Sequence, residues 1–125
     1  MLRAEQVVEM LELEPHPEGG FFKETYRCDE SVGGAYLPRR YGGDRCFGTA
    51  IYYLITGDSC STMHRVASDE IFFFHMGDPV AMLHLYEDGH VETPVLGLDL
   101  ARGEHPQVMI PRHVWQGARL QTGGN

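Results

Sequence analysis

Apolar and polar residues follow two different patterns along the chain. Near the start, apolar residues recur at approximately helical spacing with glutamates between them: Leu2, Val7, Met10 and Leu11. This spacing predicts one short amphipathic helix over residues 2–13. Pro15 and Pro17 follow it, and a proline ring cannot continue a helix. We therefore expect the helix to end before them.

From Gly20 onward the pattern changes to short runs rich in aromatic and β-branched residues, separated by glycine pairs and by Asp-Gly or Gly-Asp steps. Such runs are typical of β-strands joined by turns. The expected strands are 21–27, 47–55, 60–66, 70–76, 80–86, 90–96, 107–110 and 114–120. Asp88-Gly89 fits a tight hairpin turn between two of them. A set of short strands this large predicts an all-β sandwich or barrel.

The longest irregular connection is the glycine-rich stretch 29–46, and long loops are where lids and binding surfaces tend to lie. The sequence has no internal repeat, linker or low-complexity tail. Its 125 residues suffice for one hydrophobic core. We expect a single domain over residues 1–125, with a helix at 2–13 and a barrel over about 20–120.

Composition and charge narrow the range of partners. The formal net charge is −8, and Arg39-Arg40 is the longest basic cluster, so nucleic-acid and anionic-membrane binding are not expected. No stretch reaches the roughly 18 uninterrupted apolar residues that a membrane span needs. Charged residues near the N-terminus exclude the apolar core of a signal peptide.

The three cysteines are Cys28, Cys46 and Cys60, an odd number without a Cys-x-x-Cys pair. They are typical of free thiols in a reducing compartment. A cytoplasmic location is therefore expected.

Seven histidines are many for a chain this short, which raises the question of a metal site. Only residues two apart share a strand face, and Val66 stands two positions after His64. Glu70 could bring its carboxylate beside His64 across a strand pair, and Gln116 could join from a later strand. One imidazole, one carboxylate and one amide are a thin ligand set for a divalent metal. We expect no cofactor, with His64, Glu70 and Gln116 as the ligands should a metal bind.

These positions resemble the motifs of the cupin superfamily. Gly57, His64, Glu70 and Gly77 follow the first cupin motif, including its spacing from the glutamate to the last glycine. The second motif is echoed near the C-terminus, where Gln116 stands in place of the last histidine ligand. Two of the four metal ligands of the superfamily are therefore absent.

Longer strings resemble the cupin family DUF985, also called cupin 5, and cover nearly the whole chain. They lie at residues 15–27, 50–54, 64–70, 103–107 and 115–118. The resemblance implies a double-stranded β-helix, the jelly-roll barrel of cupins. Members of the family continue for a further strand or more after the Trp-Gln strand, so we expect either a missing late strand or a shortened sequence. Such an edge needs cover, and cupins often pair N-terminal strands, which implies a homodimer.

The string from Gly20 to Tyr26 is also similar to a strand of the nucleotide-sugar 3,5-epimerases, which are metal-free cupins with a histidine base placed much like His64. An imidazole whose other nitrogen is held by Asp69 or Glu70 is a competent base for a proton next to a carbonyl. The resemblance implies a nucleotide or nucleotide sugar as ligand and His64, Glu70 and Asp69 as catalytic residues. The tyrosine acid and the lysine of those enzymes have no assigned counterpart.

The expected ligand pocket is mostly apolar with a few polar groups, the usual composition of a small-molecule site. Phe22, Glu24 and Tyr26 are expected to share one face of strand 21–27. Phe72 and Phe74 are expected to share the face of Glu70. The predicted lining is Phe22, Glu24, Tyr26, Tyr53, Phe72, Phe74, His84 and Gln116.

Structural roles stay open for the same residues. His64 could be a buried histidine that fixes a strand pair, Glu70 could pair with Arg65 or Arg119, and Gln116 could satisfy a backbone group. The two phenylalanines could be plain core. Three functions therefore remain: an epimerase or isomerase, a non-catalytic binding or sensing module, and a metal-dependent cupin enzyme.

Overall fold

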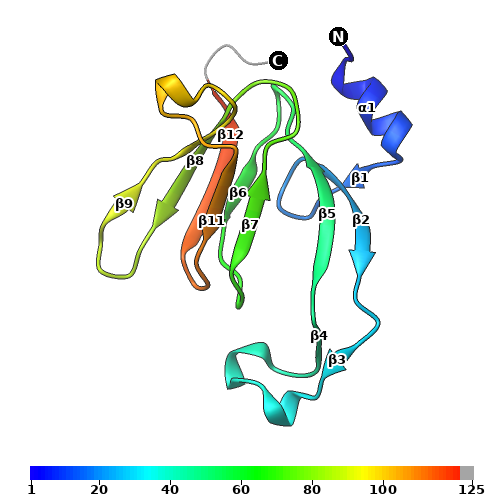
Figure 1. Ribbon diagram of the computed structural model, residues 1–125, viewed down its shortest axis with the longest axis vertical. Helices are drawn as coiled ribbons and strands as arrows, with labels where there is room; N and C mark the ends of the chain where they lie inside the picture. Colours follow the sequence, from blue (N-terminus) through cyan, green and yellow to red (C-terminus); the bar gives the residue numbers. More distant parts are fainter. Residues whose placement is uncertain (122–125) are drawn as a thin grey trace. The chain divides into compact units, whose positions relative to one another are not determined.

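The computed structural model describes residues 1–121, and the chain forms two compact units. The first unit contains residues 1–16 and 21–54, and the second contains residues 17–20 and the chain from 55 onward. Each unit has its own strands (Figure 1). The single domain expected from the chain length stays a prediction.

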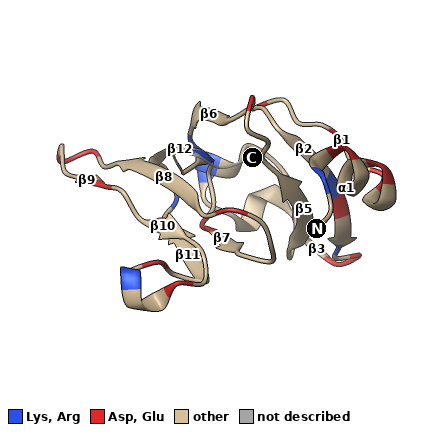
Figure 2. Cartoon of the chain, turned by 90° about the horizontal axis from the view of Figure 1, so that it is seen from above, with Lys and Arg blue, Asp and Glu red and all other residues tan. Residues whose placement is uncertain are grey.

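The first unit begins with the helix α1 (Ala4–Leu11), which is shorter than predicted at both ends. It ends because Glu12 adopts a left-handed conformation with φ 55°, a common way to close a helix. Val7 and Leu13 are the buried apolar residues of this segment, and Figure 2 shows the acidic residues of α1 in red. Within residues 1–121, no helix is long and apolar enough to cross a membrane.

Two small sheets make up the rest of the first unit. One has the order β1-β2-β5 and consists of β1 (Glu14–Pro15), β2 (Phe21–Arg27) and β5 (Thr49–Leu54). The other pairs β3 (Ser31–Val32) with β4 (Arg45–Cys46). The stretch predicted to be irregular thus contains a short strand pair and two 3-10 turns, η1 (Gly34–Tyr36) and η2 (Arg39–Tyr41).

A β-bulge interrupts β2. Glu24 lies opposite Ile51 and Tyr26 lies opposite Ala50, so two steps on β2 match one step on β5. Because directly opposite residues share a face and adjacent residues do not, Glu24 and Tyr26 project from different faces. The expectation that they share a strand face is therefore wrong, since it assumed an unbroken alternation.

The second unit holds the remaining strands. They are β6 (Ser61–His64), β7 (Glu70–Phe73), β8 (Val80–Leu85), β9 (Val91–Glu92), β10 (Val95–Leu96), β11 (Gln107–Ile110) and β12 (Trp115–Leu120). A five-stranded sheet has the order β10-β8-β12-β6, with β9 paired to β8, and a two-stranded sheet pairs β11 with β7. The predicted hairpin turn between β8 and β9 is confirmed, with Gly89 at φ 92°. A single 3-10 turn, η3 (Leu100–Arg102), precedes β11.

The core of the second unit lies between its two sheets. Its buried members are Met82, Leu96, Val108, Ile110, Val114 and Ala118. Ile110 is fully buried, and burial of such a side chain stabilises a protein by roughly 1.5–3 kcal/mol. The all-β expectation is confirmed by this arrangement of strands.

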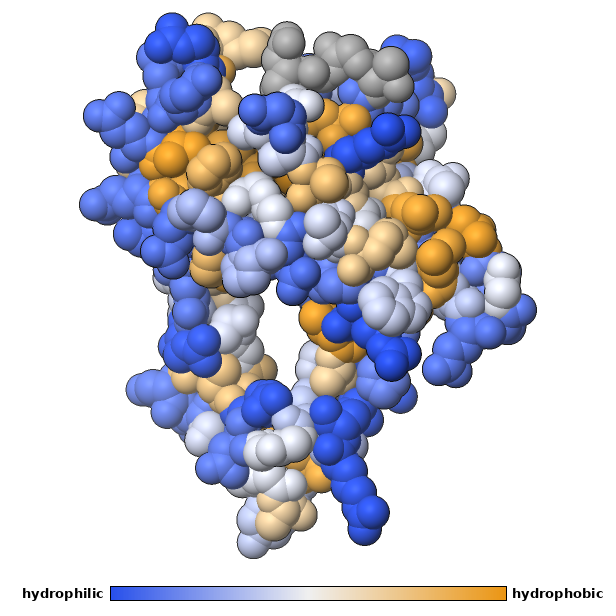
Figure 3. Space-filling model, turned by 180° about the vertical axis from the view of Figure 1, so that it is seen from behind, coloured by the Kyte–Doolittle hydropathy of each residue, from blue (hydrophilic) through white to orange (hydrophobic). Residues whose placement is uncertain are grey.

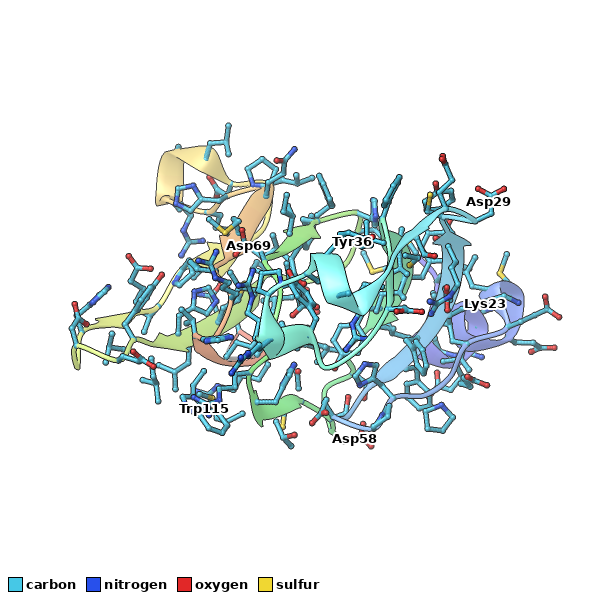
Figure 4. All side chains as sticks on the ribbon, turned by 90° about the horizontal axis from the view of Figure 1, so that it is seen from below. Lys23, Asp29, Tyr36, Asp58, Asp69 and Trp115 are labelled. Atoms are coloured by element: carbon cyan, nitrogen blue, oxygen red, sulfur yellow. The ribbon has the colours of Figure 1, made fainter. Side chains whose placement is uncertain are left out.

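The outer face of the larger sheet carries several large apolar side chains beside Arg119. Leu83, Leu85 and Trp115 are 36–43% exposed, and the Arg65 guanidinium lies 5.2 Å above the centre of the Trp115 ring. Trp115 projects outward in Figure 4, and apolar side chains reach the surface in Figure 3 as well. Since side chains alternate along a strand, the residues between these apolar ones face inward, where the sheet carries its polar groups.

Candidate functional site

A row of polar side chains crosses the inner face of the larger sheet. His64 on β6 is paired with Gln116 on β12, Gln116 with His84 on β8, and His84 with Glu92 on β9. Directly opposite residues project from the same face, so these four residues form one line, which we call the polar row. His84 and Gln116 are 1% and 2% exposed, which places the middle of the row in the interior.

A bulge in β6 turns His64 inward. Ser61 lies opposite Ala118 and His64 lies opposite Gln116, so three steps on β6 match two on β12. Strict alternation would put Ser61 and His64 on opposite faces, and the extra residue brings both to the inner face. The sequence signal near the bulge is Gly117 on the partner strand β12, where a Cβ would lie 3.2 Å from the Ser61 carbonyl oxygen, because glycine inside a strand often marks a close approach of another backbone.

His64 is held by the backbone of its own strand. Its Nδ1 lies 2.7 Å from the carbonyl oxygen of Thr62, and a carbonyl can only accept, so Nδ1 carries the proton. Nε2 is then left with a lone pair. The expectation that Asp69 or Glu70 holds this nitrogen is wrong, because the Thr62 carbonyl holds it. Asp69 Oδ1 accepts a 2.8 Å bond from the backbone N–H of Arg112.

Glu70 is bonded to Gln116. The side-chain amide of Gln116 donates from Nε2 to Glu70 Oε1 over 2.7 Å. Glu70 and Ile110 are directly opposite on β7 and β11, so this bond links the smaller sheet to the polar row. The structure therefore brings His64, Glu70 and Gln116 to one region through Gln116.

The residues at the four cupin metal positions do not fit a metal. Val66 offers no donor atom, and Gln116 stands where an imidazole is required and directs its amide N–H at Glu70. A transition metal usually takes three good nitrogen, sulfur or carboxylate ligands, and this set supplies only His64 and Glu70. Among residues 1–121, three such donors gather within 4.8 Å only at one place, Cys28, Asp29 and Glu30 of the first unit.

A pocket of about 390 Å³ opens beside the far end of the polar row. Its lining residues all belong to the second unit and are His84, Glu92, Thr93, Pro94, His105, Gln107, Val108 and Met109. His84 Nε2 is buried and has no hydrogen-bond partner within the described part of the chain. Burial lowers the pKa of His84 and the Glu92 carboxylate acts in the opposite direction, so burial favours the neutral imidazole. Sequence reasoning singled out His84 and missed the rest of this lining.

The β8–β9 hairpin orders one wall of the pocket. The Tyr86 hydroxyl donates to Glu92 Oε1 over 2.5 Å, and this bond to a carboxylate raises the pKa of Tyr86 to about 12. The rings of Tyr86 and His90 stack with centroids 3.9 Å apart. His90 Nδ1 also lies 2.6 Å from Asp88 Oδ1, so Glu92 is held by a hairpin that packs on itself.

The predicted phenylalanines pack on the core of the second unit. Phe72 lies opposite Val108, and both Phe72 and Phe74 are half-buried against the buried cluster. Their structural role is therefore that of inner-sheet residues next to Glu70. A ligand contact from them stays a prediction.

The other predicted ligand residues lie in the first unit. Phe22 and Tyr53 are directly opposite on β2 and β5, and the His16 ring contacts both edge-on at 4.8 and 5.1 Å between centroids. His16 is absent from the predicted ligand residues, because a contact from outside the strands leaves no spacing signal in the sequence. Glu24 pairs with Arg27 Nε at 2.6 Å.

Tyr26 is 56% exposed and interacts with its neighbour Cys28, whose thiol raises the pKa of the Tyr26 hydroxyl. Binding roles for Phe22, Glu24, Tyr26 and Tyr53 stay predictions.

Comparisons with known proteins agree with this architecture. The chain is 34% identical to protein SO0799 from Shewanella oneidensis, whose crystal structure it matches with a TM-score of 0.84. The match covers 99% of this chain and 73% of that one. A hypothetical protein from Leishmania major gives 30% identity and a TM-score of 0.87, with 98% of this chain and 73% of that chain covered. These likenesses confirm the predicted cupin fold.

The chain is also 30% identical over 122 residues to the uncharacterized protein YML079W of Saccharomyces cerevisiae, which covers 93% of this chain. The present chain thus spans only 60% of the length of the yeast protein. The model of the family described as Cupin superfamily (DUF985) matches residues 5–125. The chain therefore belongs to the DUF985 family of the cupin superfamily.

Proposed function

We propose that this cupin binds a small molecule without a metal and that His64 transfers a proton at a carbon next to a carbonyl group. The observation that carries the proposal is the 2.7 Å bond between His64 Nδ1 and the Thr62 carbonyl. It fixes the ring so that Nε2 is the basic nitrogen. An imidazole that is protonated on one nitrogen and free on the other is the commonest general base in enzymes.

The proposed reaction is of the epimerase or isomerase type. His64 Nε2 removes a proton from the carbon, and the electron pair of the broken C–H bond moves onto the carbonyl oxygen to give an enolate. A proton from water added to the other face of the same carbon re-forms the carbonyl and gives the epimer. Where that carbon carries a hydroxyl, the hydroxyl proton moves to the enolate oxygen, the first carbon becomes the carbonyl, and the proton held by His64 adds to the former carbonyl carbon to give the isomer. The Gln116 amide has a second N–H beyond the one bonded to Glu70, and this N–H is the donor that we assign to the enolate oxygen.

The proposed ligand class is a nucleotide or nucleotide sugar. The reacting ketosugar ring would lie at His64, and another part of the ligand would occupy the 390 Å³ pocket beside His84, which mixes apolar and polar lining. The phosphates of the ligand would contact other residues, because none of the residues lining the pocket is Lys or Arg. A homodimer and a cytoplasmic location stay predictions.

The test is hydrogen–deuterium exchange at carbon, followed by NMR in D₂O with a nucleoside diphosphate 4-ketosugar as the probe. We expect the wild-type chain to catalyse exchange and His64→Asn to lose it by about 10²–10⁴-fold, the usual contribution of one general base. His75→Asn is the matched control, because His75 is an exposed histidine in the same unit. Equal exchange by wild type and His64→Asn would overturn the assignment of the base.

A second candidate function is ligand binding without turnover. The observation that favours it is that Asp69 and Glu70 each accept a bond from another protein group, so neither supports His64 as a base. This function predicts a ligand-induced thermal shift in the wild type together with no exchange at carbon. A metal-dependent enzyme would instead contain a stoichiometric divalent metal, and elemental analysis of the purified protein would detect it.

A further inference from the structure

His84 is an unusual residue for the interior of a small sheet. It is 1% exposed, and its Nε2 has no hydrogen-bond partner within residues 1–121. Buried polar atoms are nearly always paired, because an unpaired one loses its bonds to water without compensation. An apolar residue at this central strand position would avoid that loss, so the stability of the fold does not explain a histidine.

The pocket next to His84 has the surface of a site for an amphipathic ring. Pro94, Val108 and Met109 give it an apolar wall. Polar groups lie around that wall and can donate or accept hydrogen bonds: Glu92, Thr93, His105 and Gln107. A pyranose ring has the matching character, with C–H groups on its faces and hydroxyls at its edge.

The charge of the pocket lining disfavours the binding of a phosphate group. None of its lining residues is Lys or Arg, and Glu92 contributes a carboxylate. Burial lowers the pKa of His84 and so disfavours a compensating positive charge on its ring. An uncharged molecule therefore suits this pocket better than an anion does.

We propose that the pocket binds an uncharged, hydroxyl-rich ring of the pyranose type and that His84 Nε2 forms a hydrogen bond with one of its hydroxyls. The inference rests on the proposed function only in taking the ligand to be a small molecule within the second unit, and it does not require proton transfer by His64. The two histidines are separated by two interstrand spacings, roughly 10 Å. A ring beside His84 therefore leaves room for the reacting part of a larger ligand at His64.

The proposal predicts opposite effects of one substitution on stability and on binding. His84→Leu removes the unpaired nitrogen and keeps an apolar side chain of similar size, so the melting temperature should rise by about 2–8 °C. The same substitution should weaken sugar binding by about tenfold or more, because the hydroxyl loses its partner. His75→Leu, at an exposed histidine outside the pocket, is the matched control and should change neither property.

The experiment uses methyl α-glucoside, methyl α-galactoside and methyl α-rhamnoside as probes, with glucose 6-phosphate and galactose 6-phosphate as charged counterparts. Binding is followed by saturation-transfer NMR and by the ¹⁵N shift of His84 in the labelled full chain. We expect at least one methyl glycoside to bind the wild type and shift the His84 signal. A phosphorylated counterpart should bind at least tenfold more weakly.

Three results would overturn the proposal: no binding of any methyl glycoside, tighter binding of a sugar phosphate, or unchanged sugar affinity in His84→Leu. A lower melting temperature of His84→Leu would also count against it, because it would show that the histidine stabilises the fold. Should His84→Leu fail to fold, His84→Gln provides the test, since its amide keeps a hydrogen-bonding group and should retain binding within about tenfold. Binding of a methyl glycoside, together with no exchange at carbon of the nucleoside diphosphate 4-ketosugar, would overturn only the reaction proposed for His64.

Discussion

The side-chain amide of Gln116 donates to the Glu70 carboxylate over 2.7 Å and thereby joins β12 to β7. This bond connects the two sheets of the second unit at a place where Gln116 is 2% exposed. A superfamily position that elsewhere holds a metal ligand is here part of a hydrogen bond between protein groups. The two sheets of the second unit are therefore linked at this position by a side-chain hydrogen bond.

Breaking this bond should destabilise the protein. Hydrogen bonds to charged groups contribute about 1.5–3 kcal/mol, so Gln116→Leu and Glu70→Leu should each lower the free energy of unfolding by about that amount or more. The double variant should be less destabilised than the sum of the two, with a coupling of about 0.5–3 kcal/mol. Urea unfolding of the wild type, the two single variants and the double variant measures this coupling energy. Strictly additive losses would contradict a contribution of the bond to stability.

The stability of the protein should fall in mild acid because of His84. Burial lowers the pKa of folded His84 from its ordinary value of 6.5. Below pH 6.5 His84 therefore binds a proton in the unfolded chain but not yet in the folded chain. The free energy of unfolding then decreases by up to about 1.4 kcal/mol per pH unit until the folded pKa is reached.

The measurement for this prediction is urea unfolding between pH 7.5 and pH 5. We expect His84→Leu to reduce the slope of unfolding free energy against pH by up to about 1.4 kcal/mol per pH unit, the contribution of one proton. His75→Leu, at an exposed histidine of the same unit, is the control. Parallel curves for wild type and His84→Leu would show that another group causes the loss.

Gly19 should tolerate no side chain. It has φ +106°, and a Cβ there would lie 1.9 Å from the carbonyl oxygen of Cys60. Gly103 has a comparable φ of +86° with no atom within 4 Å of the corresponding Cβ, so it separates backbone strain from steric overlap. Gly103→Ala should cost about 1–2 kcal/mol, and Gly19→Ala should cost clearly more. Equal losses in thermal or urea unfolding would mean that the contact with Cys60 relaxes without cost.

Many strand positions could be predicted from alternation and turn residues, although the order of the strands in the sheets could not. The bounds of β2 and β11 agree with the expected ones, and those of β8 and β12 differ by one residue. The run 90–96 divides into two short strands at Thr93-Pro94, because proline has no N–H for the ladder. The run 70–76 ends early, where the chain turns toward Gly77 at φ 99°.

The site was less accessible to sequence reasoning because it depends on departures from alternation. The residue types were found, but the partner of His64 is a backbone carbonyl, which no side-chain spacing can reveal. The Gln116–Glu70 bond joins residues 46 apart in the chain. The pocket depends on the loop after β9 and on β11, and the packing of a loop on a strand leaves no periodic signal.

The bulge in β6 also determines how relatives of this protein should be compared. Regular pairing from Ser61 onward, with the strand length unchanged, would place the histidine opposite Trp115 instead of Gln116 and turn the imidazole to the outer surface. Two sequences could then share the same histidine in an alignment and differ in whether it faces the interior. The register of this four-residue strand against β12 therefore decides what the histidine does, and relatives should be compared by that register as well as by residue identity.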